Sequence, residues 1–443
     1  MTNMQNSDQH DIDNNEINLD REHDNEVVER TPQFVTSERG RVVSIAGLTE
    51  RIIEEFHIEF DDDSLALQES DTQTKRRGLL RDVADYVIGI ESVQLSLPDK
   101  AQILQKAYSE IFGYGPLDAY FADPAVTTIS LENKQGISVR FGPASDLVVQ
   151  EEKDLFDDWH HVRRTIKRLL KDADAEIRSD IPIVEAGLTI NNRRVSVNVV
   201  SPPYSTDVMA DIRVHPADPI QLDTWVQQGM MTDLAADFLR RLAKSSYGFA
   251  IVGDTESGKS TLMSSILAET SLGEGLRSVE WSGELILPNG AVASKVQWPV
   301  GDDEGVTFSE RVMEVLDAQP AAIVLDEVRA DEAGAIAPLL AHQGQLRQMW
   351  VIRGASESKR IRSAISMLAR RADSDHSESM VKNLYEKLPF VIVLKRRRDR
   401  LELLEIAEWQ PAEDGSGYYD YVPLIAKGWE GLERTSNALE HEL

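Results

Sequence analysis

Cysteine is absent from this 443-residue chain. Disulfide bonds, thiolate metal sites and cysteine nucleophiles are therefore excluded, and a reducing compartment fits the composition. Long apolar runs are missing as well, because none approaches the roughly eighteen residues of a membrane span. The N-terminal stretch also lacks the basic and apolar regions of a signal peptide. From these absences we expect a cytoplasmic protein.

Positive charge is scarce: 47 Lys and Arg stand against 76 Asp and Glu, which gives a formal net charge of −29. Broad non-specific binding to nucleic acid or anionic lipid requires clustered basic side chains, so the composition argues against both. One basic run, Lys395–Arg400, is interpreted as a solvated strand end and turn rather than as a nucleic-acid site.

Composition and hydrophobic periodicity predict several successive parts. The first residues are acidic and poor in large apolar side chains, which is typical of disorder. The predicted parts are an acidic disordered arm at 1–43, a helical segment at 44–112, an α+β domain at 113–214, a polar linker at 215–223, a larger α/β domain at 224–411 and a C-terminal tail at 412–443 without usable periodicity.

A phosphate-binding motif is the most specific feature of the sequence. Residues 253–260 match G-x-x-x-x-G-K-[ST], with an apolar run, Phe249–Val252, before them and a helix-forming stretch, Ser260–Ala268, after them. Such a loop presents backbone N–H groups to phosphate, with Lys259 along the β- and γ-phosphates and the Ser260 hydroxyl on Mg²⁺. The predicted cofactors are therefore ATP and Mg²⁺. The predicted nucleotide-binding residues of this segment are Gly253, Asp254, Thr255, Glu256, Ser257, Gly258, Lys259, Ser260 and Thr261.

A second apolar run, Ala321–Leu325, ends in Asp326 and Glu327 about seventy residues after the loop. We predict a strand beside the phosphate-loop strand, with Asp326 directed to Mg²⁺ and Glu327 to the attacking water. Alternating strands and helices predict an α/β domain with a mostly parallel sheet covered on both faces. Its other predicted elements are helices at 232–245 and 307–316 and strands at 277–280, 348–352 and 390–394.

These motifs, with FGYGPLDAYFADPAVTTI at Phe112–Ile129 and Asp326-Glu327-Val328-Arg329, resemble the type II and type IV secretion-traffic ATPases. The resemblance is closest to the tight-adherence pilus and type IV secretion branch and covers roughly Leu79 to Trp409. It implies a RecA-like P-loop domain preceded by a smaller, mobile α+β domain, with nucleotide between them. It also implies a hexameric ring, at the inner face of the cytoplasmic membrane, that works with an inner-membrane platform protein.

The resemblance carries several residue roles with it. Glu284, in Val279–Leu285, falls on the family's catalytic carboxylate, and His342 falls in its histidine box. Arg194 and Arg213 fall where the branch has arginines facing the nucleotide, and Arg329 follows the acidic strand end. The catalytic residues implied are Glu284, Glu327 and His342, the additional nucleotide-binding residues are Arg194, Arg213 and Arg329, and the metal-binding residues are Ser260 and Asp326.

The sequence also departs from the family pattern. Glu256 stands inside the phosphate loop where the family has glycine, Trp281 replaces an aspartate and Trp350 replaces a histidine. Arginines of the branch are replaced at four further positions: Ser309, Asp317, Gln319 and Gly187. Because arginines stabilise phosphoryl transfer, we expect nucleotide binding with slow hydrolysis.

The preferred interpretation is an ATP-driven motor of a bacterial pilus or secretion system that couples hydrolysis to domain rotation. One alternative is a degenerate nucleotide-binding subunit that assembles with an active paralogue. A second is a RecA-type nucleic-acid translocase. The net charge and the lack of a basic groove with interspersed aromatic residues count against the translocase, so no direct nucleic-acid contact is expected.

Overall fold

The computed structural model describes residues 34–36, 42–60, 64–133, 136–142, 148–150, 155–156, 158–354, 357–397, 400–414, 418–428 and 432–443. The chain divides into two compact units, and the boundary lies between Ile111 and Phe112. The predicted disordered arm falls largely outside the described residues. Its last part differs from the prediction, because β1 (Phe34–Thr36) pairs with β2 (Val42–Ser44) in an antiparallel ladder.

Helices build the rest of the first unit, as the sequence predicts. They are α1 (Ile45–Glu59), α2 (Leu65–Gln68), α3 (Gln73–Glu91) and α4 (Leu97–Phe112). The Ser44 hydroxyl accepts a hydrogen bond from the Gly47 N–H at 3.0 Å and so caps α1. Leu48, Ile52 and Phe56 follow at helical spacing and are buried.

The second unit begins with the smaller α+β domain, here residues 112–214. Its strands are β3 (Val126–Asn133), β4 (Gly136–Phe141), β5 (Val148–Gln150), β6 (Ile183–Ile190), β7 (Arg193–Val200) and β8 (Met209–Val214). They form an antiparallel sheet in the order β5-β4-β3-β8-β7-β6. Val162, Ile166 and Leu169 of α6 (Trp159–Asp172) lie in one buried cluster with strand residues. The predicted smaller α+β domain is therefore confirmed.

A nine-stranded sheet forms the centre of the phosphate-loop domain, here residues 222–443. Its strands are β9 (Phe249–Gly253), β10 (Leu276–Glu280), β11 (Val292–Lys295), β12 (Ala322–Val328), β13 (Arg347–Arg353), β14 (Phe390–Arg396), β15 (Leu401–Pro411), β16 (Tyr419–Lys427) and β17 (Leu432–Arg434). Their order is β11-β10-β12-β13-β9-β14-β15-β16-β17, parallel from β11 to β14 and antiparallel beyond.

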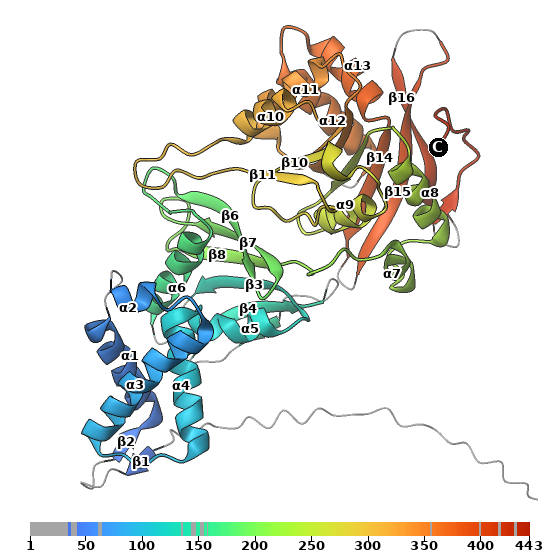
Figure 1. Ribbon diagram of the computed structural model, residues 1–443. Helices are drawn as coiled ribbons and strands as arrows, with labels where there is room; N and C mark the ends of the chain where they lie inside the picture. The colour runs from blue at the N-terminus through green and yellow to red at the C-terminus, as the bar shows by residue number, and fades with distance from the viewer. Residues whose placement is uncertain are drawn as a thin grey trace, which may run out of the picture. The chain divides into compact units, whose positions relative to one another are not determined.

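Helices cover both faces of this sheet (Figure 1). One face carries α7 (Leu222–Gln227), α8 (Asp233–Lys244) and α9 (Lys259–Ala268); the other carries α10 (Phe308–Asp317), α11 (Ala337–Ala341), α12 (Ser358–Ala372) and α13 (Ser377–Lys387). Successive β9 residues alternate between the two cores, with Ile251 in one and Val252 in the other. This confirms the predicted α/β class with a RecA-like, mostly parallel sheet.

Two details differ from the sequence-based expectation. First, β13 lies between β9 and β12, so the strand that carries Asp326 is not beside the phosphate-loop strand. Second, the chain after 411 is not a separate tail, because β16 pairs with β15. Pro423 interrupts the alternation of apolar and polar residues in β16 and lies where the ladder register shifts. Because of this interruption, the hydrophobic periodicity did not predict the strand.

The predicted absence of a membrane span can be checked against the described helices. None of them combines the length and the apolar composition needed to cross a bilayer.

A buried arginine joins the start of β13 to the end of α8. Arg347 donates to the carbonyls of Leu242, Ala243 and Tyr247 at 2.7, 2.9 and 2.9 Å, and burial lowers its pKa to about 10. These carbonyls include two from the last turn of α8, and that of Leu242 also accepts from the Ser245 N–H at 3.1 Å. Arg347 therefore fixes the helix that packs beneath the phosphate-loop strand.

We predict that Arg347→Met destabilises the phosphate-loop domain by about 2 to 4 kcal/mol, because buried carbonyls lose their donors. Chemical denaturation followed by circular dichroism measures the change. Arg360→Met is the matched control, since Arg360 is exposed and forms an exposed ion pair with Glu357, and it should change stability by less than about 0.5 kcal/mol. Equal midpoints for the Arg347 variant and the parent would contradict this role.

Candidate nucleotide-binding site

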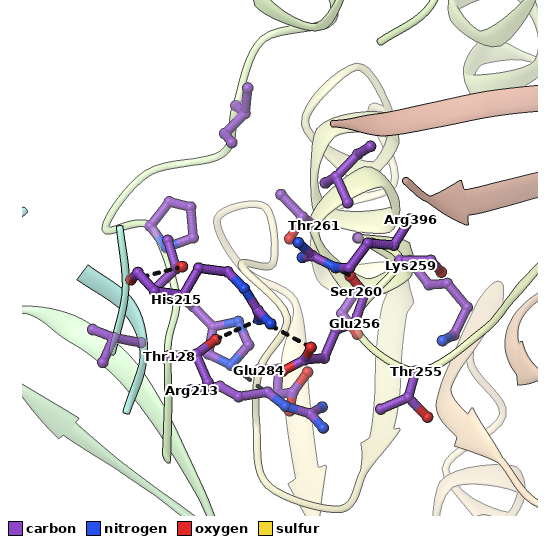
Figure 2. Close-up of a pocket in the computed structure, with 18 of the residues that line it drawn as sticks. Thr128, Arg213, His215, Thr255, Glu256, Lys259, Ser260, Thr261, Glu284 and Arg396 are labelled. Atoms are coloured by element: carbon purple, nitrogen blue, oxygen red, sulfur yellow. Dashed lines mark hydrogen bonds and ion pairs between the residues drawn. The ribbon is translucent and has the colours of Figure 1, made fainter. Parts of the chain in front are cut away.

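A cavity of about 420 Å³ lies between the smaller domain and the phosphate-loop domain (Figure 2). That volume is within the range of small-ligand sites. The cavity faces the carboxyl ends of β9 and β12, where open α/β sheets bind ligands. The predicted site residues that line it are Thr255, Glu256, Ser257, Gly258, Lys259, Ser260, Thr261, Arg213, Glu284, Asp326 and Glu327.

The phosphate loop runs from the end of β9 into the start of α9. Gly258 has φ +86°, and a Cβ there would lie 2.8 Å from the Leu401 side chain, so glycine is required for both conformation and space. The loop thus leads into a helix N-terminus that can bind an anion. Lys259 is 6% exposed, with its Nζ 2.8 Å from the Asp254 carbonyl and 3.3 Å from Glu327 Oε1.

Ser260 and Asp326 meet at the entrance to α9. The Ser260 hydroxyl donates to Asp326 Oδ1 at 3.0 Å, and burial, together with Glu284, Glu280 and Glu327 nearby, raises the pKa of Asp326 well above its usual range. Hydroxyl and carboxylate oxygens are ligands that Mg²⁺ accepts. Within the described ranges no cluster of three or more Asp, Glu or His side chains could hold a metal alone, so substrate oxygens would have to complete the coordination.

Glu284 is the acid most enclosed by cations and hydroxyl groups. It follows β10 in a turn, accepts from the Ser282 hydroxyl at 3.3 Å and lies 3.7 Å from His215 Nε2. Burial alone would raise its pKa, but His215, Arg213 and the hydroxyls of Ser196 and Ser260 lower it to about 2. Glu284 is therefore ionised at neutral pH and directed at the phosphate loop.

The smaller domain contributes the opposite wall of the cavity. Arg213, on β8, lies 3.5 Å from Asp211 Oδ2; burial would lower its pKa, but Glu284 and Asp211 raise it. His215 follows at the start of the linker, and its Nε2 lies 3.2 Å from the Ser196 hydroxyl. Burial lowers the pKa of His215, and the nearby Glu284 carboxylate opposes that shift.

Several predicted site residues do not line the cavity. They are Gly253, Asp254, Arg194, Arg329 and His342. Arg329 pairs with Glu185 and lies 4.0 Å above the Trp281 ring. His342 ends α11 before β13 begins, at the opposite end of the sheet from the phosphate loop, and its carbonyl accepts from Lys387. A γ-phosphate in this cavity is therefore out of reach of His342 in the same chain.

The structure shows what surrounds three of the residues that depart from the family pattern. Trp281 stacks on Phe308 at 5.3 Å and donates its indole N–H to the Glu327 carbonyl at 2.9 Å. Trp350 is a core residue of β13 that is fully buried. Gly187 approaches the backbone of Ser282 so closely that a Cβ would lie 1.6 Å from the Ser282 carbonyl oxygen. A side chain at 187 cannot fit in this arrangement of the two domains.

The sequence reading missed several residues that line the cavity. Arg140 on β4, Arg353 at the end of β13 and Arg396 at the end of β14 all contribute guanidinium groups. Arg396 belongs to the basic run interpreted as solvated, yet its Nε donates to the Glu256 carbonyl at 2.7 Å. The signal available was its position, directly after an apolar strand of the phosphate-loop sheet. Apolar contacts come from Ile220, Trp225 and Leu401.

Comparison with known proteins agrees with this site. Residues 155–346 match the family described as Type II/IV secretion system protein. The "Type IV secretion system protein VirB11" of Brucella suis is 23% identical over 265 residues, which cover 54% of this chain and 71% of that protein.

Solved structures were compared as well. The X-ray structure of the Legionella pneumophila ATPase DotB gives a TM-score of 0.44 at 17% identity and covers 67% of this chain and 80% of that one. The crystal structure of the pilus retraction motor PilT with bound ADP gives a TM-score of 0.43 at 18% identity, with coverage of 70% and 82%. The family match and the sequence relationship show that this chain is similar to the type II/type IV secretion ATPases.

Proposed function

We propose that this protein binds ATP with Mg²⁺ and hydrolyses it slowly as a component of a bacterial secretion or pilus system. The observation that carries the proposal is the meeting of Lys259, the bonded Ser260–Asp326 pair and the ionised Glu284 at one cavity. Lys259 and the loop N–H groups would hold the phosphates. Ser260 and Asp326 would hold Mg²⁺, which supplies charge neutralisation at the transferring phosphoryl group.

Glu284 is the proposed general base toward the attacking water. Its low pKa keeps it ionised and able to orient water, at the cost of basicity. Glu327 instead pairs with Lys259 and with Arg353 Nη2, at 3.3 and 2.9 Å. We therefore propose that Glu327 orients Lys259 and Arg353, in addition to the role toward the attacking water that the sequence predicts.

The nucleotide would contact both domains, so its binding and loss can change how they sit on each other. Among the contacts that join the domains, Trp298 Nε1 donates to the Glu185 carbonyl at 2.6 Å, Lys295 Nζ donates to the Gly187 carbonyl at 3.3 Å, and Arg329 pairs with Glu185. Rotation of the smaller domain about the linker would break them. This is the motion we propose for a motor.

The alternative of a degenerate subunit is supported by specific observations. Arg194, Arg329 and His342 do not line the cavity, so three groups implied by the resemblance are missing from it. The smaller domain still supplies Arg213, and Glu284 is ionised, which favours slow hydrolysis over none. Phosphate release by the purified protein distinguishes the two.

The first prediction concerns Lys259. Lys259→Ala should weaken Mg·ATP binding at least about a hundredfold, because a charge-assisted contact to phosphate is lost. Isothermal titration calorimetry measures the affinity. Lys244→Ala, an exposed lysine in the last turn of α8, is the matched control and should bind like the parent. Equal affinity for the Lys259 variant and the parent would exclude the phosphate-loop assignment.

The second prediction concerns Glu284. Glu284→Gln keeps the side-chain shape but removes the negative charge, so phosphate release should fall about a hundredfold or more while ATP affinity changes by less than about tenfold. Glu274→Gln, on an exposed carboxylate, should leave both unchanged. A Glu284 variant that hydrolyses ATP at the parent's rate would remove this residue from the chemistry.

The third prediction concerns assembly. The family resemblance implies a hexameric ring bound to an inner-membrane platform protein, and we include both in the proposal. Light scattering of the purified chain with Mg²⁺ and ATP should give about six times the mass of one chain. A monomer at micromolar concentration under these conditions would contradict the ring.

A further inference from the structure

Glu256 is an unexpected residue for a phosphate loop. Its backbone has φ +59°, the left-handed conformation that glycine adopts without strain and glutamate does not. Its carboxylate also adds negative charge where a polyanion would bind. Both features oppose phosphate binding by the loop, so the structure should contain something that offsets them.

The carboxylate of Glu256 is paired with an arginine of the other domain. Arg140 Nη1 lies 2.9 Å from Glu256 Oε2 and also donates to the Thr128 hydroxyl at 3.1 Å, and Figure 2 shows Thr128 and Glu256 joined by dashed lines to one guanidinium. The two charged side chains are only 8% and 21% exposed. Arg396 fixes the Glu256 backbone from the other side. The phosphate loop is thus held between β4 and β14.

The same guanidinium lines the cavity with Lys259 and Ser260. Arg140 is therefore already joined to the phosphate loop, through the carboxylate of Glu256. A nucleotide phosphate carries more charge than a carboxylate and offers more acceptor oxygens to an arginine fork. Exchanging one anion for the other at Arg140 leaves the partly buried Glu256 carboxylate without this cation, and that cost weakens nucleotide binding.

We propose that Glu256 is an internal placeholder for nucleotide phosphate: Arg140 pairs with Glu256 in the nucleotide-free protein and turns to the phosphates of a bound nucleotide. This inference rests on the proposed ATP site and adds to it a binding residue from the smaller domain. It also gives that domain two alternative anionic partners, one in the loop and one in the ligand. Nucleotide binding then exchanges one contact between the domains for another.

Calorimetry with Mg·ATP tests the exchange through four proteins: the parent, Glu256→Gly, Arg140→Gln and the double variant. Glu256→Gly removes the competing carboxylate and the left-handed strain, so ATP should bind about tenfold more tightly or better. In the Glu256→Gly background, Arg140→Gln should weaken binding about tenfold, because it removes a charged contact to the phosphate. The double variant also avoids leaving a buried carboxylate without its partner. Glu256→Gln and Glu274→Gln form a matched pair for charge removal, and only the first should tighten binding.

Two results would overturn the placeholder role. One is a Glu256→Gly protein that binds ATP no more tightly than the parent. The other is an Arg140→Gln change with no effect in the Glu256→Gly background, which would make Arg140 a partner of Glu256 alone. Failure of the underlying site is distinguishable, because ATP binding by the parent would then be absent or independent of Lys259.

Discussion

Charge balance in one partly closed cavity is the constraint on which this structure depends. Five carboxylates line it together with Lys259 and several arginines; they belong to Glu185, Glu256, Glu284, Asp326 and Glu327. Each buried carboxylate would be costly alone, so the arrangement is stable only while cations from both domains remain beside it. Glu256 pairs with Arg140 of the smaller domain, and Glu284 lies beside His215 of the linker. A change in the position of the smaller domain would therefore change the electrostatics of the site.

Local sequence patterns predicted many of the helices and strands because residues close together in the chain specify each of them. An apolar run before a glycine-rich loop specifies β9 and α9, and the run ending in Asp326 specifies β12, whatever the rest of the chain does. Strand order is different, because it depends on which strands pair. Nothing local reveals that β13 separates β9 from β12, or that β16 joins the sheet despite Pro423.

The same distinction applies to the site. Lys259, Ser260 and Asp326 could be assigned because a loop and a strand end carry them. Arg140 and Arg396 reach the cavity only through packing of β4 and β14 around the loop, and an arginine in a strand has no sequence signature for such a role. Of the residues that the resemblance implies, Glu284 and Arg213 line the cavity, whereas Arg194, Arg329 and His342 do not.

The unusual residues around the cavity form a connected set. Gly187 allows β6 to touch the turn that carries Glu284, and Trp281 fills the space beside it against Phe308. Glu256 reaches across to Arg140. These aromatic and ionic contacts favour close packing of the two domains.

The most direct test is an experimental structure of the full chain with Mg²⁺ and a non-hydrolysable ATP analogue, by electron cryomicroscopy or crystallography. The account predicts phosphates on the 253–260 loop, Mg²⁺ between Ser260 and Asp326, and the smaller domain in contact with the nucleotide through Arg213 and Arg140. Nucleotide bound elsewhere, or bound to the loop with no contact from the smaller domain, would contradict it.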